Sequence, residues 1–297
     1  MRFGLLGTGP WARMIHGPAL AAHPDAELVG VWGRRPEAAA GLAADLSTRP
    51  YDDPDALFAD CDAVAVALPP DIQAPLAVRA ARAGRHLLLD KPLATTPSGA
   101  REVVDAVAEA QVASVVFFTL RFAAASSAWI DRQAVAGGWH TGRAEWLSSI
   151  FGGSESPYAA SPWRREKGAL WDVGPHALSV LLPVLGDIPD LAADLRALPG
   201  RGDTVHLLLR HTTGATSTLT VSHTMPPAAS TVAAELHGVE GISTLPSREE
   251  DEVPAAYRRA IDALVTAAET GEPHPCDARF AARVTDILSA AETALNR

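Results

Sequence analysis

A lysine that directly follows an apolar run is the first candidate for chemistry. Lys91 lies in the tripeptide Asp90-Lys91-Pro92, and the chain has one other lysine, Lys167, while its remaining basic residues are arginines. The pKa of a lysine amine can be tuned, whereas arginine stays protonated. An ammonium held in a rigid turn by Pro92 can hydrogen-bond a hydroxyl and stabilise the oxyanion formed from it. The alternative is a surface lysine in a turn, and the scarcity of lysine in this chain weighs against it.

A histidine with a carboxylate four residues before it is the second candidate. Asp172 and His176 flank the tripeptide Val-Gly-Pro, so we expect Asp172 just before a helix and His176 in its first turn. Histidine is the usual general base near neutral pH, and a nearby aspartate can orient it or hold a substrate hydroxyl. The alternative is a helix-capping aspartate beside an incidental histidine, and the spacing alone favours that alternative.

A glycine turn follows the first apolar run. The residues Gly7, Thr8, Gly9, Pro10, Trp11 and Ala12 have the pattern G-x-G-x-x-A. In such a turn the first glycine permits the tight bend, the second lets a pyrophosphate approach the backbone, and the alanine lets the helix pack on the sheet. The helix that begins here would direct free N–H groups at the phosphates. The pattern therefore predicts a dinucleotide site, because it lies between a strand and a helix.

Two adjacent arginines follow the second apolar run. A site for NAD usually has an acidic residue there, which accepts a hydrogen bond from the 2′-hydroxyl of the ribose. Here the positions hold Arg34 and Arg35, and the next acidic residue is Glu37. Guanidinium matches a 2′-phosphate in charge and geometry, so we expect NADP in preference to NAD. Two solvated arginines at a loop would give the same pattern.

The first 118 residues alternate between apolar runs and helical segments. We expect strands over residues 3–6, 28–32, 63–68, 86–89 and 112–118, and helices over 11–22, 36–46, 71–83 and 97–110. This alternation is typical of an α/β domain with a doubly wound parallel sheet. Ligands bind at the carboxyl edge of such a sheet. That edge would carry the glycine turn, the Asp90-Lys91 turn, and also Leu68 and Pro69, which we assign to the cofactor site.

The pattern changes after residue 118. We expect helices over residues 128–136, 175–185, 256–270 and 277–296, and strands over 143–150, 204–211, 216–223, 231–237 and 241–245. Short glycine-containing turns join these strands, as in hairpins. We therefore expect a second domain of α+β type over residues 119–297, built on an antiparallel or mixed sheet.

Composition limits the classes of partner. The chain has 297 residues, 47% of them hydrophobic, and 25 basic against 35 acidic residues give a net charge of −10. An acidic chain without a long basic run is a poor ligand for nucleic acid or anionic membranes. We see no apolar run approaching the ~18 residues of a membrane helix and no signal peptide in residues 1–6. The two cysteines have no metal-ligand spacing. We expect a cytoplasmic protein without a metal, a membrane or a nucleic-acid partner.

Taken together, these motifs resemble the Gfo/Idh/MocA oxidoreductases, which include glucose–fructose oxidoreductase and inositol dehydrogenases. The resemblance covers nearly the whole chain and rests on the glycine turn, Asp90-Lys91-Pro92, Arg121-Phe122, Asp172-x-Gly174-x-His176 and Gly238-x-x-Gly241. It implies an N-terminal Rossmann domain over residues 1–118 and a C-terminal domain with an open-faced sheet that often forms an oligomer interface. It also implies that Lys91, Asp172 and His176 are catalytic and work with NAD(P).

Several positions depart from the family's pattern. Asp90 replaces a glutamate, and the stretch from Pro69 to Gln73 lacks the asparagine and histidine that are common there. Lys167-Gly168-Ala169 replaces a glycine triplet, and Ser179 replaces an aspartate. The catalytic three are intact although their surroundings are not typical.

The resulting hypothesis is an NAD(P)-dependent dehydrogenase or reductase acting on a sugar, cyclitol or other polyol. Arg121, Trp163 and Lys167 are candidate substrate contacts, and Tyr158, Arg164 and Trp171 could line the same pocket. Two alternatives stay open, namely a nucleotide-binding sensor without turnover and an enzyme that keeps its nucleotide permanently bound for internal redox chemistry. By resemblance we also expect a homo-oligomer, a dimer or tetramer.

Overall fold

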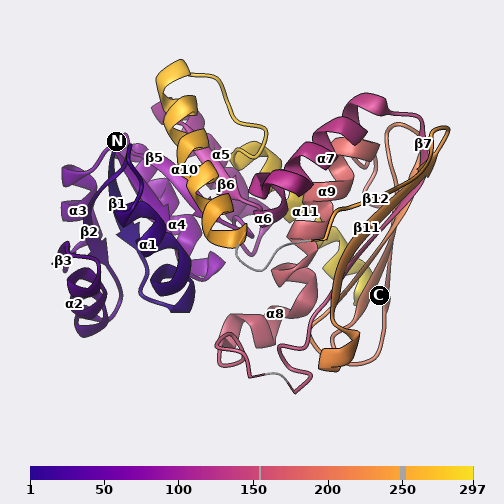
Figure 1. Cartoon of the computed structure of the whole chain (residues 1–297), viewed down its shortest axis with the longest axis horizontal. Coiled ribbons are helices and arrows are strands. Elements are labelled where there is room, and N and C mark those ends of the chain that lie inside the picture. The colour runs from indigo at the N-terminus through magenta and orange to yellow at the C-terminus, as the bar shows by residue number, and fades with distance from the viewer. Residues whose placement is uncertain (154, 248–251, 297) are drawn as a thin grey trace. The chain divides into compact units, whose positions relative to one another are not determined.

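The computed structural model describes residues 1–153, 155–247 and 252–296, which form two compact units (Figure 1). The first unit comprises Met1–Phe122 and Glu250–Thr285, and the second comprises Ala123–Glu249 and Asp286–Arg297. The N-terminal segment of the first unit thus extends four residues past the expected boundary at residue 118. The segment Glu250–Thr285, which lies within the expected second domain, also belongs to the first unit.

The first unit is built on a six-stranded parallel sheet with the order β3-β2-β1-β4-β5-β6. All four residues of β4 are buried, which explains its uninterrupted apolar sequence. The strands are β1 (Arg2–Leu6), β2 (Glu27–Trp32), β3 (Arg49–Tyr51), β4 (Ala63–Val66), β5 (His86–Asp90) and β6 (Ser114–Phe117). The expected doubly wound α/β sheet is therefore confirmed. The short strand β3 was not predicted.

Capping residues mark the ends of helix α5 in the first unit. Thr96 caps α5 by accepting the Gly99 N–H at 3.1 Å, and Gln111 ends that helix in a left-handed conformation. The helical elements are η1 (Ala12–His16, a π-helical turn), α1 (Gly17–Ala21), α2 (Pro36–Asp45), α3 (Pro54–Asp60), α4 (Pro70–Arg82), α5 (Pro97–Ala110), α6 (Thr119–Phe122) and α10 (Glu252–Thr270). Helix α3 was not predicted, and the helix expected over residues 11–22 contains the π-helical turn.

Helix α10 completes the first unit although it lies far from it in sequence. It packs against η1, α1, α6 and the strands β5 and β6. Its residues Ala256, Tyr257, Ile261 and Leu264 are buried, at spacings of one helical face. A helical period shows that a segment has an apolar face but does not show which sheet that face covers.

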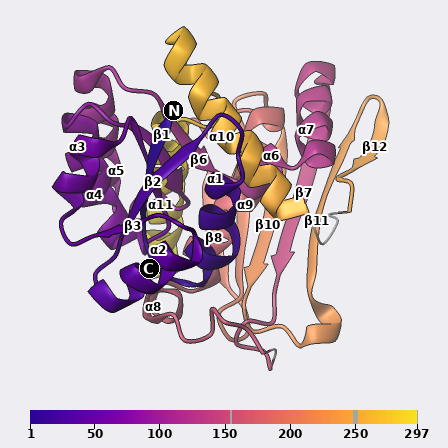
Figure 2. The same cartoon turned by 60° about the vertical axis from the view of Figure 1, so that its left-hand side comes forward.

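The second unit is built on a mostly antiparallel six-stranded sheet with the order β12-β11-β7-β10-β9-β8 (Figure 2). Its one parallel pair joins β7 to β10. Its strands are β7 (Trp139–Leu147), β8 (Leu195–Pro199), β9 (Val205–Arg210), β10 (Thr216–Ser222), β11 (Thr231–Gly238) and β12 (Gly241–Thr244). The expected α+β class is confirmed, and β8 was not predicted.

Helix α9 (Gly174–Leu185) lies against β7 and β10 and forms the core of the second unit. The other helical elements here are α7 (Ala124–Ala136), α8 (Pro162–Asp172), η2 (Pro227–Ala229) and the end of α11 (Ala278–Leu295). The helical segment Pro162–Leu185 is long and apolar enough to cross a membrane, which we did not expect from the sequence. However, 89% of its most apolar 18-residue stretch is buried inside the structure. A mostly buried helix of this kind is also found in the cores of soluble proteins.

Candidate active site

The glycine turn has the geometry that its sequence predicts. Gly7 donates its N–H to the Trp32 carbonyl at 2.8 Å and has φ +129°. A Cβ on Gly7 would lie 2.4 Å from the Ala67 carbonyl oxygen, so only glycine fits. At Gly9, by contrast, a Cβ would have no neighbouring heavy atom of the described residues within 4 Å. The backbone is therefore open at the position where a pyrophosphate would approach.

The helix after the glycine turn begins as expected and then widens. Arg13 donates its N–H to the Gly9 carbonyl at 3.1 Å, and Ala12 is fully buried. Residues Ala12–His16 then form the π-helical turn η1 before α1 starts. Such turns are uncommon and often lie at functional sites.

The end of strand β2 contacts the glycine turn. A Cβ on Gly33 would lie 2.6 Å from the Cγ2 atom of Thr8. Arg34 and Arg35, which follow Gly33, are exposed, and Arg35 is the cap of helix α2. Exposed guanidiniums directly beside the glycine turn fit the expected 2′-phosphate contact, which stays a prediction.

The lysine turn lies at the same carboxyl edge, two strands away from the glycine turn. Strand β5 ends at Asp90, whose Oδ1 accepts the Lys91 N–H at 2.8 Å. Lys91 is half-buried, and its peptide bond to Pro92 is cis. Leu68 and Pro69 follow the intervening strand β4, and Pro69 is the cap of helix α4. The first unit thus brings all the expected cofactor residues to one edge of one sheet.

A buried histidine behind the lysine turn was not predicted. His16 is fully buried, its Nδ1 lies 2.9 Å from the Tyr257 hydroxyl, and its Nε2 lies 3.7 Å from Asp90 Oδ2. Burial lowers the pKa of His16 to about 3, so the ring is neutral. Burial, with a smaller contribution from the charge of Asp90, raises the pKa of Tyr257 well above 10. A carboxylate can only accept, so the contact with Asp90 favours the tautomer with the proton on Nε2, and Nδ1 then accepts the Tyr257 O–H.

In the second unit, Asp172 ends helix α8 and is almost completely buried. Arg164 Nε donates to Asp172 Oδ2 at 2.7 Å, and the Nε2 atom of the buried His223 lies 3.1 Å from the same oxygen. The contact between His223 Nε2 and Asp172 Oδ2 does not have the geometry of a hydrogen bond. On its other side, His223 Nδ1 lies 2.7 Å from the Ser148 hydroxyl. Neither Arg164 nor His223 was predicted to hold this aspartate.

His176 lies in the first turn of α9, as expected. Its ring stacks on Trp146 with a centroid distance of 4.4 Å and an interplanar angle of 17°. The side chain is 5% exposed. Ser179, at the position where the family pattern has an aspartate, donates its hydroxyl to the His176 carbonyl at 2.7 Å. The imidazole is therefore oriented by an aromatic face.

The sequence also matches models of known families. Residues 1–118 match the NAD-binding Rossmann-fold domain of the GFO/IDH/MocA oxidoreductase family, and residues 132–244 match the C-terminal domain of the same family. The chain belongs to the Gfo/Idh/MocA family. The first unit is accordingly an NAD-binding Rossmann domain, and the resemblance read from the sequence is confirmed.

Individual relatives agree with this assignment. The dTDP-3,4-didehydro-2,6-dideoxy-alpha-D-glucose 3-reductase of Streptomyces antibioticus is 32% identical over 199 residues, which are 65% of this chain and 58% of the reductase. The inositol 2-dehydrogenase of Rhizobium meliloti (strain 1021) is 35% identical over 124 residues, 41% of this chain and 37% of that enzyme. Both matches span less than two thirds of the relatives' own lengths.

The likeness in fold extends over the whole chain. An oxidoreductase from Agrobacterium radiobacter, solved in complex with NAD+, L-tartaric acid and magnesium, superposes with a TM-score of 0.84. The superposition covers 100% of this chain and 96% of that chain at 20% identity. At this identity, the superposition shows a shared fold.

The expected substrate contacts of this Gfo/Idh/MocA protein, Arg121, Trp163 and Lys167, are divided between the two units and have different neighbours. Arg121 is half-buried on α6 of the first unit. In the second unit, the Arg164 guanidinium lies 4.8 Å from the ring centroids of Trp163 and Tyr158. Lys167 Nζ lies 3.1 Å from Glu292 Oε1 and 5.1 Å from the centroid of Trp171. A substrate contact by Lys167 would compete with Glu292, and the roles of Arg121, Trp163 and Lys167 stay predictions.

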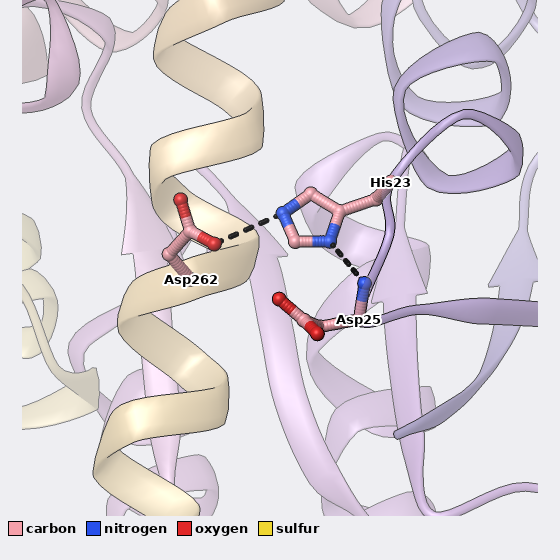
Figure 3. A group of neighbouring side chains, drawn as sticks. All are labelled: His23, Asp25 and Asp262. Atoms are coloured by element: carbon pink, nitrogen blue, oxygen red, sulfur yellow. Dashed lines mark hydrogen bonds and ion pairs between the residues drawn. The ribbon is translucent and has the colours of Figure 1, made fainter.

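A histidine–carboxylate group elsewhere in the first unit has another role. Figure 3 shows His23 between Asp25 and Asp262. Asp25 donates its backbone N–H to His23 Nδ1 at 3.2 Å, so the proton is on Nε2, which lies 3.0 Å from Asp262 Oδ1. With both nitrogens engaged by the protein, the ring does not present a lone pair to a metal. The group ties α10 to the turn after α1.

Proposed function

We propose that this chain is an NAD(P)-dependent oxidoreductase that moves hydride between a nicotinamide and a hydroxyl or ketone carbon of a sugar, cyclitol or related polyol. The observation that carries the proposal is that the open backbone at Gly9 and the Lys91 turn occupy one edge of one Rossmann sheet. A nucleotide whose phosphates lie over Gly9 would extend its nicotinamide along that edge. The named functions of the relatives, a sugar reductase and an inositol dehydrogenase, support the same class of substrate.

The chain's own residues would share the proton and charge chemistry. When bound, the nicotinamide supplies the hydride donor or acceptor. Lys91 would hydrogen-bond the reacting oxygen and favour its anionic form. His176 would take the hydroxyl proton during oxidation and return it during reduction. Asp172, which pairs with Arg164 and lies 3.1 Å from His223 Nε2, would orient His176 or accept a hydrogen bond from a second substrate hydroxyl.

We propose NADP as the preferred nucleotide and NAD as the weaker one. Arg34 and Arg35 are exposed directly after the strand that contacts the glycine turn, and the acidic residue usual for NAD is absent from the end of that strand. Their planar guanidiniums would pair with a 2′-phosphate, whereas NAD offers them only a hydroxyl.

A homo-oligomer, a dimer or tetramer, is also part of the proposal. Strand β9 alternates buried and exposed residues, and the sheet leaves Leu208 52% exposed and Ile242 66% exposed. Large exposed apolar side chains often mark a surface that another protein covers. Sedimentation at several concentrations would measure the state.

The experiment that tests the function uses the purified chain, both nucleotides and a panel of polyols and sugars. Formation of reduced nicotinamide that requires both a polyol and His176 supports the proposal, with His176→Ala as control. A nucleotide that binds but never changes its redox state with any compound contradicts it and indicates a sensor. A nucleotide that survives dialysis and is then reduced by added sugar indicates an enzyme with a permanently bound nucleotide.

A further inference from the structure

A single buried glutamine holds the backbone of the lysine turn. Gln73 lies in the first turn of α4 and is 0% exposed. Its Oε1 accepts the Asp90 N–H at 2.8 Å, and its Nε2 donates to the Asp90 carbonyl at 2.7 Å. The same Nε2 lies 3.2 Å from the Pro92 carbonyl and 3.3 Å from the Leu93 carbonyl. One side chain therefore engages four backbone groups of one turn.

The bonding pattern fixes which end of the amide is which. Nε2 faces three carbonyl oxygens, which can only accept hydrogen bonds, and Oε1 faces a backbone N–H, which can only donate. Among side chains of similar size, only an amide offers a donor and an acceptor in this arrangement. An ionised glutamate keeps the acceptor but loses the donor, and leucine keeps neither.

The four backbone groups that contact Gln73 belong to residues on both sides of Lys91 in the sequence. Asp90 precedes it and is held at both its N–H and its carbonyl, while Pro92 and Leu93 follow it and are held at their carbonyls. The Asp90 carboxylate also accepts the Lys91 N–H. Gln73 thus holds the backbone on both sides of the residue from which the lysine side chain leaves the sheet edge.

We propose that Gln73 is the positioning residue of Lys91, so that the reach and direction of the catalytic amine depend on a side chain of another element. This inference rests on the proposed function for its kinetic consequence, although its structural consequence can be measured without turnover. In the competing explanation, Gln73 only stabilises the fold. That explanation predicts a lower stability with no local effect at Lys91.

The environment of the Lys91 amine can be measured directly by labelling amines, because Lys91 and Lys167 are the only lysines in the sequence. Reductive methylation with ¹³C-formaldehyde labels these two amines and the N-terminus, and Lys167→Arg assigns the signals. We compare wild type, Gln73→Glu, Gln73→Leu and Thr285→Val by ¹³C NMR. Thr285 is the matched control, because it is also 0% exposed and donates its hydroxyl to the Ala281 carbonyl, outside the lysine turn.

We expect the Lys91 signal in Gln73→Glu to move toward that of a free dimethyl-lysine, while the Lys167 signal stays in place. Thr285→Val should leave both signals unchanged. Because Gln73→Glu places a carboxylate against three carbonyl oxygens, Gln73→Leu, which brings no charge into the buried site, serves as the folded variant, with the same expected shift of the Lys91 signal, if Gln73→Glu does not fold. A Lys91 signal identical in wild type and Gln73→Glu overturns the proposal.

The kinetic arm separates positioning from general stability. In Gln73→Glu we expect kcat to fall by about 100-fold, as for other small displacements of catalytic groups, with little change in nucleotide Kd. An unchanged kcat overturns the proposal. If the wild type reduces no nucleotide with any polyol, the proposed function fails, and the NMR comparison alone decides whether Gln73 positions Lys91.

Discussion

Arg164 and Asp172 form an ion pair between the two ends of helix α8, with 2.7 Å between Arg164 Nε and Asp172 Oδ2. Gly168, at φ +65°, interrupts the helix between them. Asp203 stabilises the interruption, because its Oδ2 accepts the Ala169 N–H at 3.2 Å. The carboxylate is 4% exposed and the guanidinium 20% exposed, so this pair is largely desolvated. The ion pair should therefore decide the position of the Asp172 carboxylate.

Arg164→Met should therefore destabilise the second unit, because a buried carboxylate loses the guanidinium that pairs with it. We expect the free energy of unfolding to fall by about 3 kcal/mol, the cost typical of breaking a buried pair from one side. Urea denaturation measures it. Arg143→Met, which removes a guanidinium 58% exposed and paired with Glu235, is the matched surface control and should have a much smaller effect. Equal losses of unfolding free energy in the two variants would show that the buried Arg164–Asp172 pair contributes no more to stability than the exposed Arg143–Glu235 pair.

Alanine substitutions at Gly7 and Gly9 of the glycine turn should have different effects, one mainly on stability and the other mainly on nucleotide binding. Gly9→Ala adds a methyl into open space, so stability should change by less than about 1 kcal/mol, while the methyl blocks the approach of the pyrophosphate and weakens nucleotide binding. Gly7→Ala forces a Cβ to 2.4 Å from a carbonyl at φ +129° and should destabilise the fold by roughly 2–4 kcal/mol. Thermal unfolding and nucleotide titration test both. Unimpaired nucleotide binding by Gly9→Ala would contradict the assigned phosphate position.

His16 should make stability depend on pH. Its folded pKa is about 3 because of burial, well below the usual 6.5, so the unfolded chain takes up a proton that the native ring does not. The stabilisation is complete above about pH 6.5 and is lost as the pH falls toward 3, at about 1.4 kcal/mol per pH unit.

Denaturant unfolding of wild type and His16→Met between about pH 7 and pH 4 isolates this effect. His86, His211 and His274 also have pKa values lowered by burial, but they remain in both proteins and cancel in the difference. The difference in unfolding free energy should shift in favour of the variant as the pH falls. A difference independent of pH would contradict a neutral, buried His16.

The arginines after β2 should set the choice of nucleotide. Arg34→Ala should weaken NADPH binding by about tenfold, the loss of one charge-assisted contact, and leave NADH binding almost unchanged. Arg82→Ala, which removes an exposed arginine of α4 in the same unit, is the control for net charge. Fluorescence titration with both nucleotides measures the ratio of affinities. Equal weakening of both nucleotides by Arg34→Ala would remove the basis for preferring NADP.

The sequence predicted the parallel sheet well, because strands such as β4 are buried on both faces and therefore appear as unbroken apolar runs. It did not predict β3, which has three residues and contains Pro50, or α8, whose apolar and charged residues are interrupted by Gly168. The assignment of α10 to the first unit depends on which sheet its apolar face covers, and helical periodicity does not contain that information.

The site shows the same division. Gly7 was predicted from the spacing of the glycine turn, whereas Lys91 and His176 were predicted from their short motifs together with the resemblance to the family. Gln73 and His223 were missed, because each is a buried polar residue whose role depends on partners that are distant in the sequence, the Asp90 turn and Asp172. The sequence does carry one signal at Gln73, because this residue stands where the family pattern has another polar residue, but the signal does not show which backbone groups Gln73 binds.

The most direct test of the central claim compares nicotinamide reduction by wild type, His176→Ala and Lys91→Arg with one polyol substrate, alongside nucleotide binding by fluorescence. Removing a positioned proton-transfer group should slow turnover by about 10²–10⁴-fold in His176→Ala. Lys91→Arg should also be severely impaired, because its guanidinium differs from an amine in shape and acidity. Both variants should still bind nucleotide. Full activity in either variant would contradict the account, because the imidazole and the amine could not then be acting on the reacting oxygen.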